Sequence, residues 1–539
     1  MFLKSFTFFL FLGLFSPAIA QLKVHEIFSD NMVLQRDQQI TVWGTARPKE
    51  EIYVHLHITT ADGSREEGSS TIADESGNWS VKLAEFPVGT NGKLTVTGSP
   101  ERKPGIGKQK GPESRTFSNI AVGEVWLCSG QSNMEWPLSK TVQAQQVIAN
   151  SSNPNIRLFT VPKFAIDTPQ TQLNPKVEPA SKKWFVCNPQ TVANFSAVGY
   201  HFGKKLQAEL NVPIGLIHTS WGGTPAEAWT SRPGLQNEET LKYYTTNLDQ
   251  ASSKYDPEKS KSNYEEQMKK WRLAADAAKK NGKQIPRQPR LAGKPGTNSN
   301  DPSSLYNGMI HPLLGLRFRG AIWYQGESNA GTIARATEYQ LLFSKMIADW
   351  RTQFKQGDFS FYFVQLAPFN AGNPMGENWP ILRESQLKTA QTVKNTGMAV
   401  ITDVGNPTDI HPQDKAPVGT RLALLALAKD YQKKIVPMGP VFSSMTTVDS
   451  SCLITFQHAE NGLISSDGKE LTGFTICGED QVFHPATATI KGNEVIVVSD
   501  KVKKPVAVRY GWANYPIVNL ANKEGIPATP FRTDNFEVK

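Results

Sequence analysis

Cysteine is scarce in this sequence of 539 residues, which contains only Cys128, Cys187, Cys452 and Cys477. No cysteine and histidine stand at the spacing of a zinc site, so we expect no metal centre. Four cysteines allow three disulfide pairings in an exported protein. Cys452 and Cys477 fall within one β-rich segment and are the pair that we expect to form, whereas Cys128 lies in an apolar run and fits a small buried side chain.

Long apolar runs are also absent after the N-terminus, where no stretch approaches the roughly 20 apolar residues that a membrane-spanning helix needs. The apolar run at residues 6–15 is shorter, follows Lys4, and precedes the small-residue motif Ala18-Ile19-Ala20. This order is typical of a secretory signal peptide. We therefore expect residues 1–20 to be a signal peptide and the protein to be exported, to the periplasm or the cell exterior.

The charge balance is only mildly one-sided. The formal net charge is +9 over a long chain, and many of the lysines fall within residues 254–294. No basic stripe interleaved with aromatic residues is present, so we expect no nucleic-acid binding and interpret these lysines as a solvated face. The composition, 39% hydrophobic and 20% charged, is that of a folded globular protein.

Short strand-like runs dominate residues 21–118. Several of them alternate apolar and polar residues, as at residues 52–57 and 79–83, and a turn signal at residues 74–78 separates two of them. Strands at this spacing predict an N-terminal β-sandwich domain. The all-β pattern returns at residues 436–539, which we expect to form a C-terminal β-rich module.

Residues 119–435 instead alternate buried-strand runs with helical patterns. This alternation predicts a parallel sheet within a three-layer α/β domain. The helices expected from apolar spacing cover residues 196–210, 339–354 and 418–429. A polar stretch at about residues 247–301 interrupts the pattern, and we expect it to be an insertion near the working edge of the sheet, with a helix at residues 264–280 and a mobile tail.

Small and polar residues follow four of the predicted strands. Ser132 comes shortly after an apolar run, and Gly222-Gly223, Gln325 and His411 follow later strands. The carboxyl ends of parallel strands meet at one edge of a sheet, where ligands bind in open α/β folds. A serine, a base, a glycine turn and an amide at that edge would supply what acyl transfer needs, which is a nucleophile, a proton acceptor and donors for the oxyanion.

A second serine competes for the nucleophile role. Gly326-Glu327-Ser328-Asn329-Ala330 approaches the G-x-S-x-G elbow and follows a strand, but its fifth residue is alanine. Glu327 caps the following helix or braces the site, or it contacts substrate. Separate exchanges of Ser132 and Ser328 for alanine distinguish the two assignments.

Taken together, the motifs resemble those of the sialate O-acetylesterase family, a branch of the SGNH hydrolases. They are GQSNM at residues 130–134, SWGGT at 220–224, WYQGESN at 323–329 and DIHP at 409–412. The resemblance extends to residues 28–35 and 510–514, and so covers nearly the whole mature chain. It implies a serine esterase without metal or cofactor that removes acetyl groups from sugars, on a three-layer, flavodoxin-like SGNH hydrolase core with attached β-domains.

The resemblance also implies roles for individual residues. Ser132 matches the nucleophile and His411 the general base. The oxyanion donors that it implies are the backbone N–H of Ser132, an N–H of Gly222 or Gly223, and the side chain of Gln325.

The acid departs from the family pattern, which places an aspartate three residues before the histidine. Thr408 stands at that position, and Asp409 lies two residues before His411. Three arrangements remain open: Asp409 orients His411, a backbone carbonyl does so, or the site works as a Ser–His dyad.

The expected substrate is an O-acetylated carbohydrate, with O-acetylated sialic acids first because the family is named for them. Acetylated plant polysaccharide of the xylan or xyloglucan type is an alternative substrate, and a non-catalytic carbohydrate-binding protein is the alternative of a different class. Trp221, Trp323, Tyr324 and the insertion at residues 247–301 are the candidates to face substrate, because they lie near the motifs.

Overall fold

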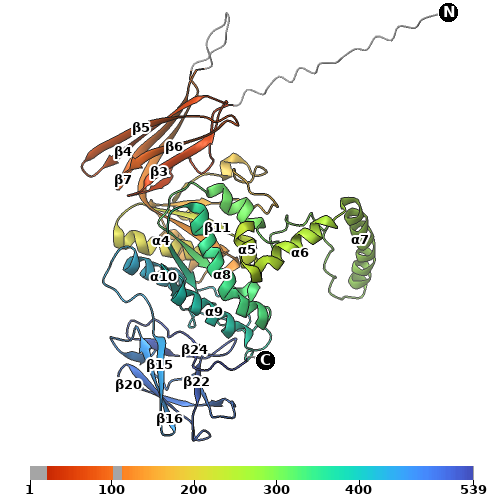
Figure 1. Cartoon of the computed structure of the whole chain (residues 1–539), viewed down its shortest axis with the longest axis vertical. Coiled ribbons are helices and arrows are strands. Elements are labelled where there is room, and N and C mark those ends of the chain that lie inside the picture. Colours follow the sequence, from red (N-terminus) through yellow and green to blue (C-terminus); the bar gives the residue numbers. More distant parts are fainter. Residues whose placement is uncertain (1–20, 101–111, 538–539) are drawn as a thin grey trace, which may run out of the picture.

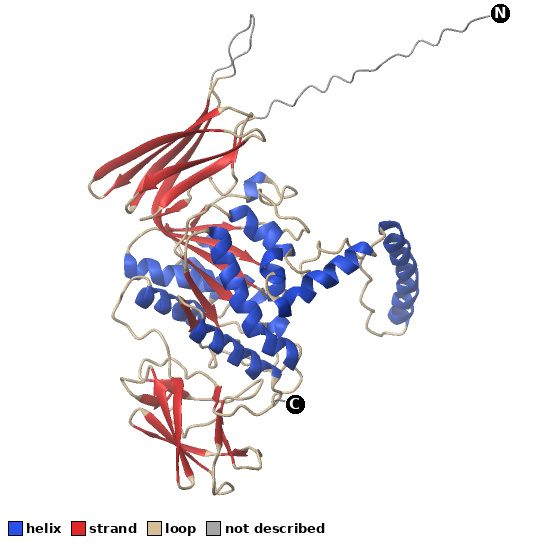
Figure 2. Cartoon of the chain, viewed as in Figure 1, coloured by secondary structure: helices blue, strands red, loops and turns tan. Residues whose placement is uncertain are grey.

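The computed structural model describes residues 21–100 and 112–537, so the predicted signal peptide at residues 1–20 lies outside the described residues. An N-terminal β region, a central α/β core and a C-terminal β module follow one another along the molecule (Figure 1). Figure 2 shows that the helices are concentrated in the core and its projecting arm, while strands make up the two outer parts. No helix in the described part of the chain is long and apolar enough to cross a membrane.

Two sheets form the N-terminal β region (Figure 1). The smaller contains β1 (Lys23–Val24), β3 (Gln39–Thr45) and β6 (Asn78–Glu85). The larger contains β2 (Val33–Gln35), β4 (Glu51–Thr60), β5 (Gly63–Ile72), β7 (Gly89–Gly98) and the first part of β8 (Ser114–Gly130). Along β4, Ile52, Val54, Leu56 and Ile58 are buried while their neighbours are more exposed. This period of two directs one face of the sheet into the core and the other toward solvent.

β8 joins the N-terminal region to the core as one continuous strand. Residues 114–122 pair with β7, and residues 124–130 pair with β11 (Ile214–Ser220). The predicted domain boundary between residues 118 and 119 therefore falls inside a strand. Side chains along β8 are exposed or partly buried up to Asn119 and buried from there on, which marks where the strand enters the core.

The core sheet orders its strands β10-β9-β11-β8-β12-β13-β14. Neighbouring strands run parallel, as predicted, except that β10 runs antiparallel to β9. Without the β9–β10 edge, the strands follow the flavodoxin-like order 2-1-3-4-5. The other strands of this sheet are β9 (Asn153–Thr160), β10 (Phe185–Cys187), β12 (Gly320–Tyr324), β13 (Ser360–Val364) and β14 (Thr396–Ala399).

Helices cover both faces of this sheet, which explains why its strands are apolar throughout. On one face Phe202 packs edge-on against Trp126 of β8, with ring centroids 5.0 Å apart. On the other face Phe343 stacks on Trp323 of β12 at 6.1 Å. The three predicted helices are confirmed, and a fourth joins them: α4 (Ala197–Leu210), α8 (Ile333–Phe354), α9 (Asn378–Thr392) and α10 (Ala416–Lys429).

The predicted insertion at residues 247–301 begins inside α6 (Lys242–Ser253) and contains all of α7 (Pro257–Lys280). The two helices form an arm that stands off the core (Figure 1). Every residue of α7 is exposed or partly exposed. The chain after α7 returns along the helix, where Trp271 Nε1 donates to the Pro286 carbonyl at 2.8 Å. The helix begins before the predicted start at Tyr264 because Asp256 caps it and proline is well suited to the first turn.

The C-terminal β module contains two four-stranded sheets and a two-stranded sheet. The expected disulfide between Cys452 and Cys477 is wrong, because both thiols are free and buried. Cys452 lies on β16 and Cys477 on β18, which belong to different sheets, so closeness in sequence does not bring the two thiols together. One sheet is β15 (Val441–Val448), β16 (Ser451–Gln457), β21 (Glu494–Val498) and β20 (Thr487–Lys491). The others are β19 (His484–Pro485), β18 (Phe474–Cys477), β22 (Ala507–Tyr510) and β24 (Phe531–Arg532), and the pair β17 (Leu463–Ser465) and β23 (Leu520–Asn522).

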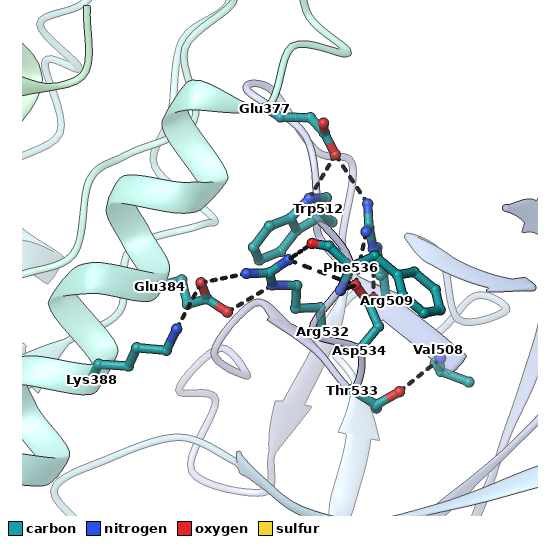
Figure 3. A network of polar contacts seen from close by, with 10 residues as sticks. All are labelled: Glu377, Glu384, Lys388, Val508, Arg509, Trp512, Arg532, Thr533, Asp534 and Phe536. Atoms are coloured by element: carbon teal, nitrogen blue, oxygen red, sulfur yellow. Dashed lines mark hydrogen bonds and ion pairs between the residues drawn. The ribbon is translucent and has the colours of Figure 1, made fainter. Parts of the chain in front are cut away.

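Charged side chains hold the C-terminal module against the core beside α9 (Figure 3). Arg532 donates to both oxygens of Glu384 at 2.9 and 3.0 Å. Arg509 donates to Glu377 at 3.0 Å and to both oxygens of Asp534 at 2.8 and 2.9 Å. Such bidentate arginine–carboxylate pairs fix orientation as well as distance.

A fully buried arginine, Arg383 of α9, completes this interface. It donates to the carbonyls of Leu366 and Ala367 after β13 and to those of Ala513 and Asn514 in the module. The guanidinium has no carboxylate among these partners, and burial lowers its pKa to about 9. The run YGWAN at residues 510–514 thus packs the module onto a loop at the carboxyl end of the core sheet.

A buried carboxylate holds the N-terminal region to the core. Glu124 of β8 is fully buried and accepts hydrogen bonds from Arg36 at 2.5 Å, Arg319 at 3.0 Å and Gln35 at 3.1 Å. Burial by itself raises the pKa of Glu124, but the hydrogen bonds and charge of Arg319, followed by the hydrogen bond from Arg36, outweigh it and hold that pKa below 4.5.

We predict that Glu124→Gln lowers the free energy of unfolding at pH 7 by on the order of 3 kcal/mol, because it removes the charge that two arginines share. The folded-state pKa is depressed, so the carboxylate's contribution is present above pH 4.5 and is lost as the pH falls through the folded-state value. The difference in unfolding free energy between parent and variant should therefore become smaller below pH 4.5. Urea denaturation at pH 7 and at pH 4 measures both effects.

Glu66→Gln is the matched control, because Glu66 is an exposed carboxylate on β5. It should change the unfolding free energy by less than about 0.5 kcal/mol. A Glu124→Gln variant as stable as this control would contradict the role of Glu124.

Candidate active site

The candidate site lies at the carboxyl end of β8, where the strand order reverses. β11 lies on one side of β8 and β12 on the other, and the chain leaves β8 between them. In open α/β sheets this switch point forms the crevice in which ligands bind. The backbone joins the three strand ends there, since Gln131 N donates to the Tyr324 carbonyl at 2.9 Å and Trp221 N donates to the Gly130 carbonyl at 3.1 Å.

Glycine is required at the last residue of β8. Gly130 has φ +139°, which L side chains rarely adopt, and a Cβ there would lie 2.2 Å from the Tyr324 carbonyl oxygen. This turn leads directly into the short helix α1 (Ser132–Glu135). Ser132 is therefore the first residue after a sharp strand-to-helix turn, and it is partly exposed while Gln131 and Asn133 beside it are buried.

The glycine turn after β11 lies beside Ser132. A Cβ on Gly222 would lie 3.2 Å from Ser132 Cβ. The N–H of Gly222 donates to Glu135 Oε2 at 2.7 Å, and Lys163 binds the other oxygen of Glu135 at 2.5 Å. No hydrogen bond between described residues uses the N–H of Gly223 or of Ser132. The structure thus distinguishes the two glycines that the sequence left equivalent. The N–H of Gly222 is bound to the Glu135 carboxylate, whereas the N–H of Gly223 is not.

Gln325 is fully buried after β12, and its side-chain amide already has partners. Nε2 donates to Asn329 Oδ1 at 2.7 Å and to the Thr224 carbonyl at 3.2 Å, while Oε1 accepts from Tyr339 at 2.8 Å. The amide would need to release one of these acceptors in order to bind an oxyanion. Its contact with Thr224 places it directly below the glycine turn.

The loop that carries His411 contacts the turn that carries Ser132. The ring of Trp136 stacks on the His411 imidazole with centroids 4.9 Å apart and planes 17° apart. Asn133 Nδ2 donates to the Ile410 carbonyl at 3.0 Å. No hydrogen bond joins Ser132 Oγ to His411 within residues 21–100 and 112–537. Segments almost three hundred residues apart nevertheless meet at one edge of the sheet.

Asp409 faces the His411 imidazole from within the same loop. Asp409 Oδ1 lies 3.4 Å from His411 Nδ1 and accepts from the His411 backbone N–H at 2.9 Å. Thr408, which stands where the family usually has aspartate, instead donates to Asn406 Oδ1. Burial lowers the pKa of His411 below 6.5, Asp409 opposes this shift, and the ammonium of Lys415 adds to it.

The rival serine lies in a different setting. Ser328 is the second residue of the one-turn helix η7 (Glu327–Asn329), and its N–H donates to Gln131 Oε1 at 3.3 Å. Its neighbour Glu327 points inward, where Oε1 accepts from Asn133 Nδ2 at 2.6 Å. Of the roles that the sequence left open for Glu327, this contact supports bracing of the site.

Two of the candidate substrate-facing residues were predicted wrongly. Trp323 and Tyr324 are fully buried, because they belong to the central strand β12. Helix α8 covers Trp323. Trp221 follows β11, is partly exposed, and has Lys163 Nζ 5.2 Å from its ring centroid. Trp221 therefore remains available to a ligand at the site.

Sequence reasoning missed Asn133, Glu135 and Lys415. Asn133 and Glu135 stand in or beside the motif that contains Ser132, and Lys415 lies four residues after His411. Their positions next to the motifs were the available signal, but their contacts with other loops depend on the fold. Among the described residues, no group of three or more histidine, cysteine, aspartate or glutamate side chains could hold a metal ion.

Comparison with known proteins identifies the family. The family model described as carbohydrate esterase, sialic acid-specific acetylesterase matches residues 122–279 and 294–428. The chain belongs to this family. It is accordingly a carboxylic ester hydrolase, and the match supports a carbohydrate acetylesterase.

The matches to individual relatives cover nearly the whole of this chain and nearly the whole of each relative. The sialate O-acetylesterase of Mus musculus is 27% identical over 522 residues, covering 91% of this chain and 89% of that protein. The sialate O-acetylesterase of Homo sapiens is 25% identical over 526 residues, covering 90% and 87%. A crystal structure of a carbohydrate acetylesterase from Xanthomonas citri is 35% identical with a TM-score of 0.76, and the match covers 95% of this chain and all of that one.

We predict that His411 titrates below pH 6.5 and that Asp409→Asn lowers its pKa further, because Asp409 is the carboxylate that raises it. NMR of protein labelled with ¹³C-histidine follows the titration, and the spectrum of His411→Gln assigns the signal. The signal of His55, which pairs with Glu66 in the N-terminal region, serves as the internal reference for the spectra. A His411 pKa unchanged or raised by Asp409→Asn would contradict the contact.

Proposed function

We propose that the chain is an exported serine esterase that releases acetate from O-acetylated carbohydrates, with residues 1–20 as its signal peptide. Ser132 is the nucleophile, His411 the general base, and Asp409 the group that orients His411. The observation that carries this proposal is the meeting of the Ser132 turn and the His411 loop at the switch point of the sheet. Family membership supports the same reaction class.

The reaction begins when His411 Nε2 takes the proton of Ser132 Oγ. Asp409 faces Nδ1, which leaves Nε2 as the nitrogen available to the serine. Ser132 Oγ then attacks the acetyl carbonyl carbon, and its oxygen becomes the oxyanion. The Ser132–His411 hydrogen bond forms when substrate binds, as in many hydrolases whose catalytic bonds tighten only in the complex.

Backbone donors stabilise the oxyanion. The N–H groups of Ser132 and Gly223 have no partner among the described residues, whereas the N–H of Gly222 donates to Glu135, so we assign the glycine donor to Gly223. Gln325 contributes if its amide exchanges the Thr224 carbonyl for the oxyanion.

Collapse of the tetrahedral intermediate expels the sugar oxygen, which takes the proton from His411 and leaves as an alcohol. The acetyl group remains on Ser132 as an ester. Water, deprotonated by His411, attacks this ester, acetate leaves, and the proton returns to Ser132 Oγ.

We predict that Ser132→Ala reduces kcat for p-nitrophenyl acetate by about 10³-fold or more, because it removes the nucleophile. His411→Gln should cost on the order of 10³-fold as well. Ser328→Ala is the matched control and should retain activity within about 3-fold. Activity that survives Ser132→Ala but not Ser328→Ala would transfer the nucleophile to Ser328.

The proposed substrate is an O-acetylated sialic acid, following the names of the mammalian relatives. Acetylated plant polysaccharide is the second candidate, because the Xanthomonas citri relative is described more broadly as a carbohydrate acetylesterase. We predict a higher kcat/KM for acetylated sialoglycan than for acetylated xylan or xyloglucan. Acetate release measured on equal concentrations of acetyl ester tests this, and the opposite order would reassign the substrate. Binding to either glycan without turnover would support a non-catalytic carbohydrate-binding protein.

A further inference from the structure

A buried lysine lies behind the candidate site and has no role in the mechanism above. Lys415 precedes α10 and is fully buried, four residues after His411. Taking an ammonium group out of water is costly unless neighbouring groups compensate it. A lysine in this position therefore needs a structural or functional reason.

The groups around Lys415 that favour its ammonium form are an amide oxygen, two aromatic rings and nearby carboxylates. Its Nζ donates to Asn133 Oδ1 at 2.5 Å and lies 5.4 Å from the ring centroid of Tyr324 and 6.0 Å from that of Trp136. Burial lowers the pKa of Lys415 to about 7, while the carboxylates of Glu327, Asp409 and Asp414 oppose that shift. Lys415 is thus mostly charged below neutral pH.

Asn133 passes the effect of Lys415 to the loop of His411. An ammonium group can only donate, so the amide of Asn133 must present its oxygen to Lys415. The nitrogen then points the other way, where it donates to Glu327 Oε1 at 2.6 Å and to the Ile410 carbonyl at 3.0 Å. One amide, in one forced orientation, therefore connects the turn of Ser132, the loop of Glu327 and the backbone next to His411.

Glu327 is the acidic partner of this arrangement. Its side chain is buried, its Oε2 has no hydrogen-bond partner in the part of the chain that the structure describes, and burial raises its pKa. Lys415 is the nearby cation that opposes this rise. Removal of Lys415 would leave a buried carboxylate without compensating charge, which is costly.

We propose that Lys415 is a positioning residue for the esterase reaction, which through Asn133 and Glu327 fixes the His411 loop against the Ser132 turn. The inference rests on the proposed function, because it assigns Lys415 to the same site. It predicts that loss of Lys415 affects kcat more than KM, since Lys415 lies behind the reacting groups.

The same geometry predicts a shift in pH dependence of known sign. Three charged groups act on the His411 imidazole: Asp409 raises its pKa, while Lys415 and, more weakly, Lys140 lower it. Lys415→Met removes a cation and should move the acid limb of kcat/KM to higher pH. Asp409→Asn removes an anion and should move that limb to lower pH.

The test compares Lys415→Met, Glu327→Gln, the double variant and Lys429→Met. Lys429 is the matched control, because it lies at the other end of the same helix, has a pKa lowered by burial and donates to the Thr396 carbonyl at 2.7 Å. Acetate release is measured between pH 5 and pH 9, and active sites are counted with a fluorophosphonate. Thermal unfolding shows that each variant is folded.

We expect Lys415→Met to lower kcat per active site by about 10-fold or more with KM changed by less than about 3-fold, because small displacements of catalytic groups are expensive. Adding Glu327→Gln should restore at least about 3-fold of kcat, because the uncompensated carboxylate is then gone. Lys429→Met should leave kcat, KM and the acid limb unchanged.

Two outcomes would overturn the inference in distinguishable ways. An active parent with Lys415→Met equal to Lys429→Met in kcat and pH profile would show that Lys415 only fills the core, and the proposed function would stand. A parent that hydrolyses no acetyl ester would overturn the proposed function and the role of Lys415 together.

Discussion

The joining of three strand ends at the carboxyl end of β8 is the constraint on which the rest of the site depends. Because β8 is the strand at which the order reverses, the chain that leaves β8 contacts α4 on one face of the sheet, while the chain that leaves β12 enters α8 on the other face. A crevice forms between them at the carboxyl ends of the strands. Gly130 turns the chain there without a side chain, under the Tyr324 carbonyl. Ser132, the glycine turn and Gln325 are all placed by backbone hydrogen bonds among these three strand ends.

The two β regions hold this arrangement from opposite ends. At the amino ends of the core strands, Glu124 of β8 accepts hydrogen bonds from two arginines that belong to different segments. These bonds fix the direction in which β8 enters the core. At the carboxyl end, Arg383 bonds backbone carbonyls on both sides of the interface with the C-terminal module. The outer regions are therefore parts of the structure that supports the site.

Much of the architecture could be predicted from the sequence because it is encoded locally. Helical apolar spacing found α4, α8 and α10, and alternation found β4 and β6 of the N-terminal region. The start of α7 was missed although Asp256-Pro257 is a local signal for a helix N-terminus. The domain boundary at residues 118 and 119 was placed inside β8 because a strand shared by two sheets leaves no break in the pattern.

The site was only partly predictable, for a different physical reason. Motifs placed Ser132, the turn at Gly222-Gly223 and His411 at strand ends, where the fold brings their segments together. The burial of Trp323 and Tyr324, and the separation of Cys452 from Cys477, depend on which element covers which face. The contacts of Lys415 and Glu135 likewise join segments distant in sequence, which no pattern of residues in one segment specifies.

Mapping the residue that an alkyl fluorophosphonate modifies is the most direct measurement of the central claim. Peptide mass spectrometry of the modified full-length protein should show one adduct, on Ser132, which fails to form when His411 is replaced by glutamine. An adduct on Ser328, or one on Ser132 that forms equally fast without His411, would contradict the account.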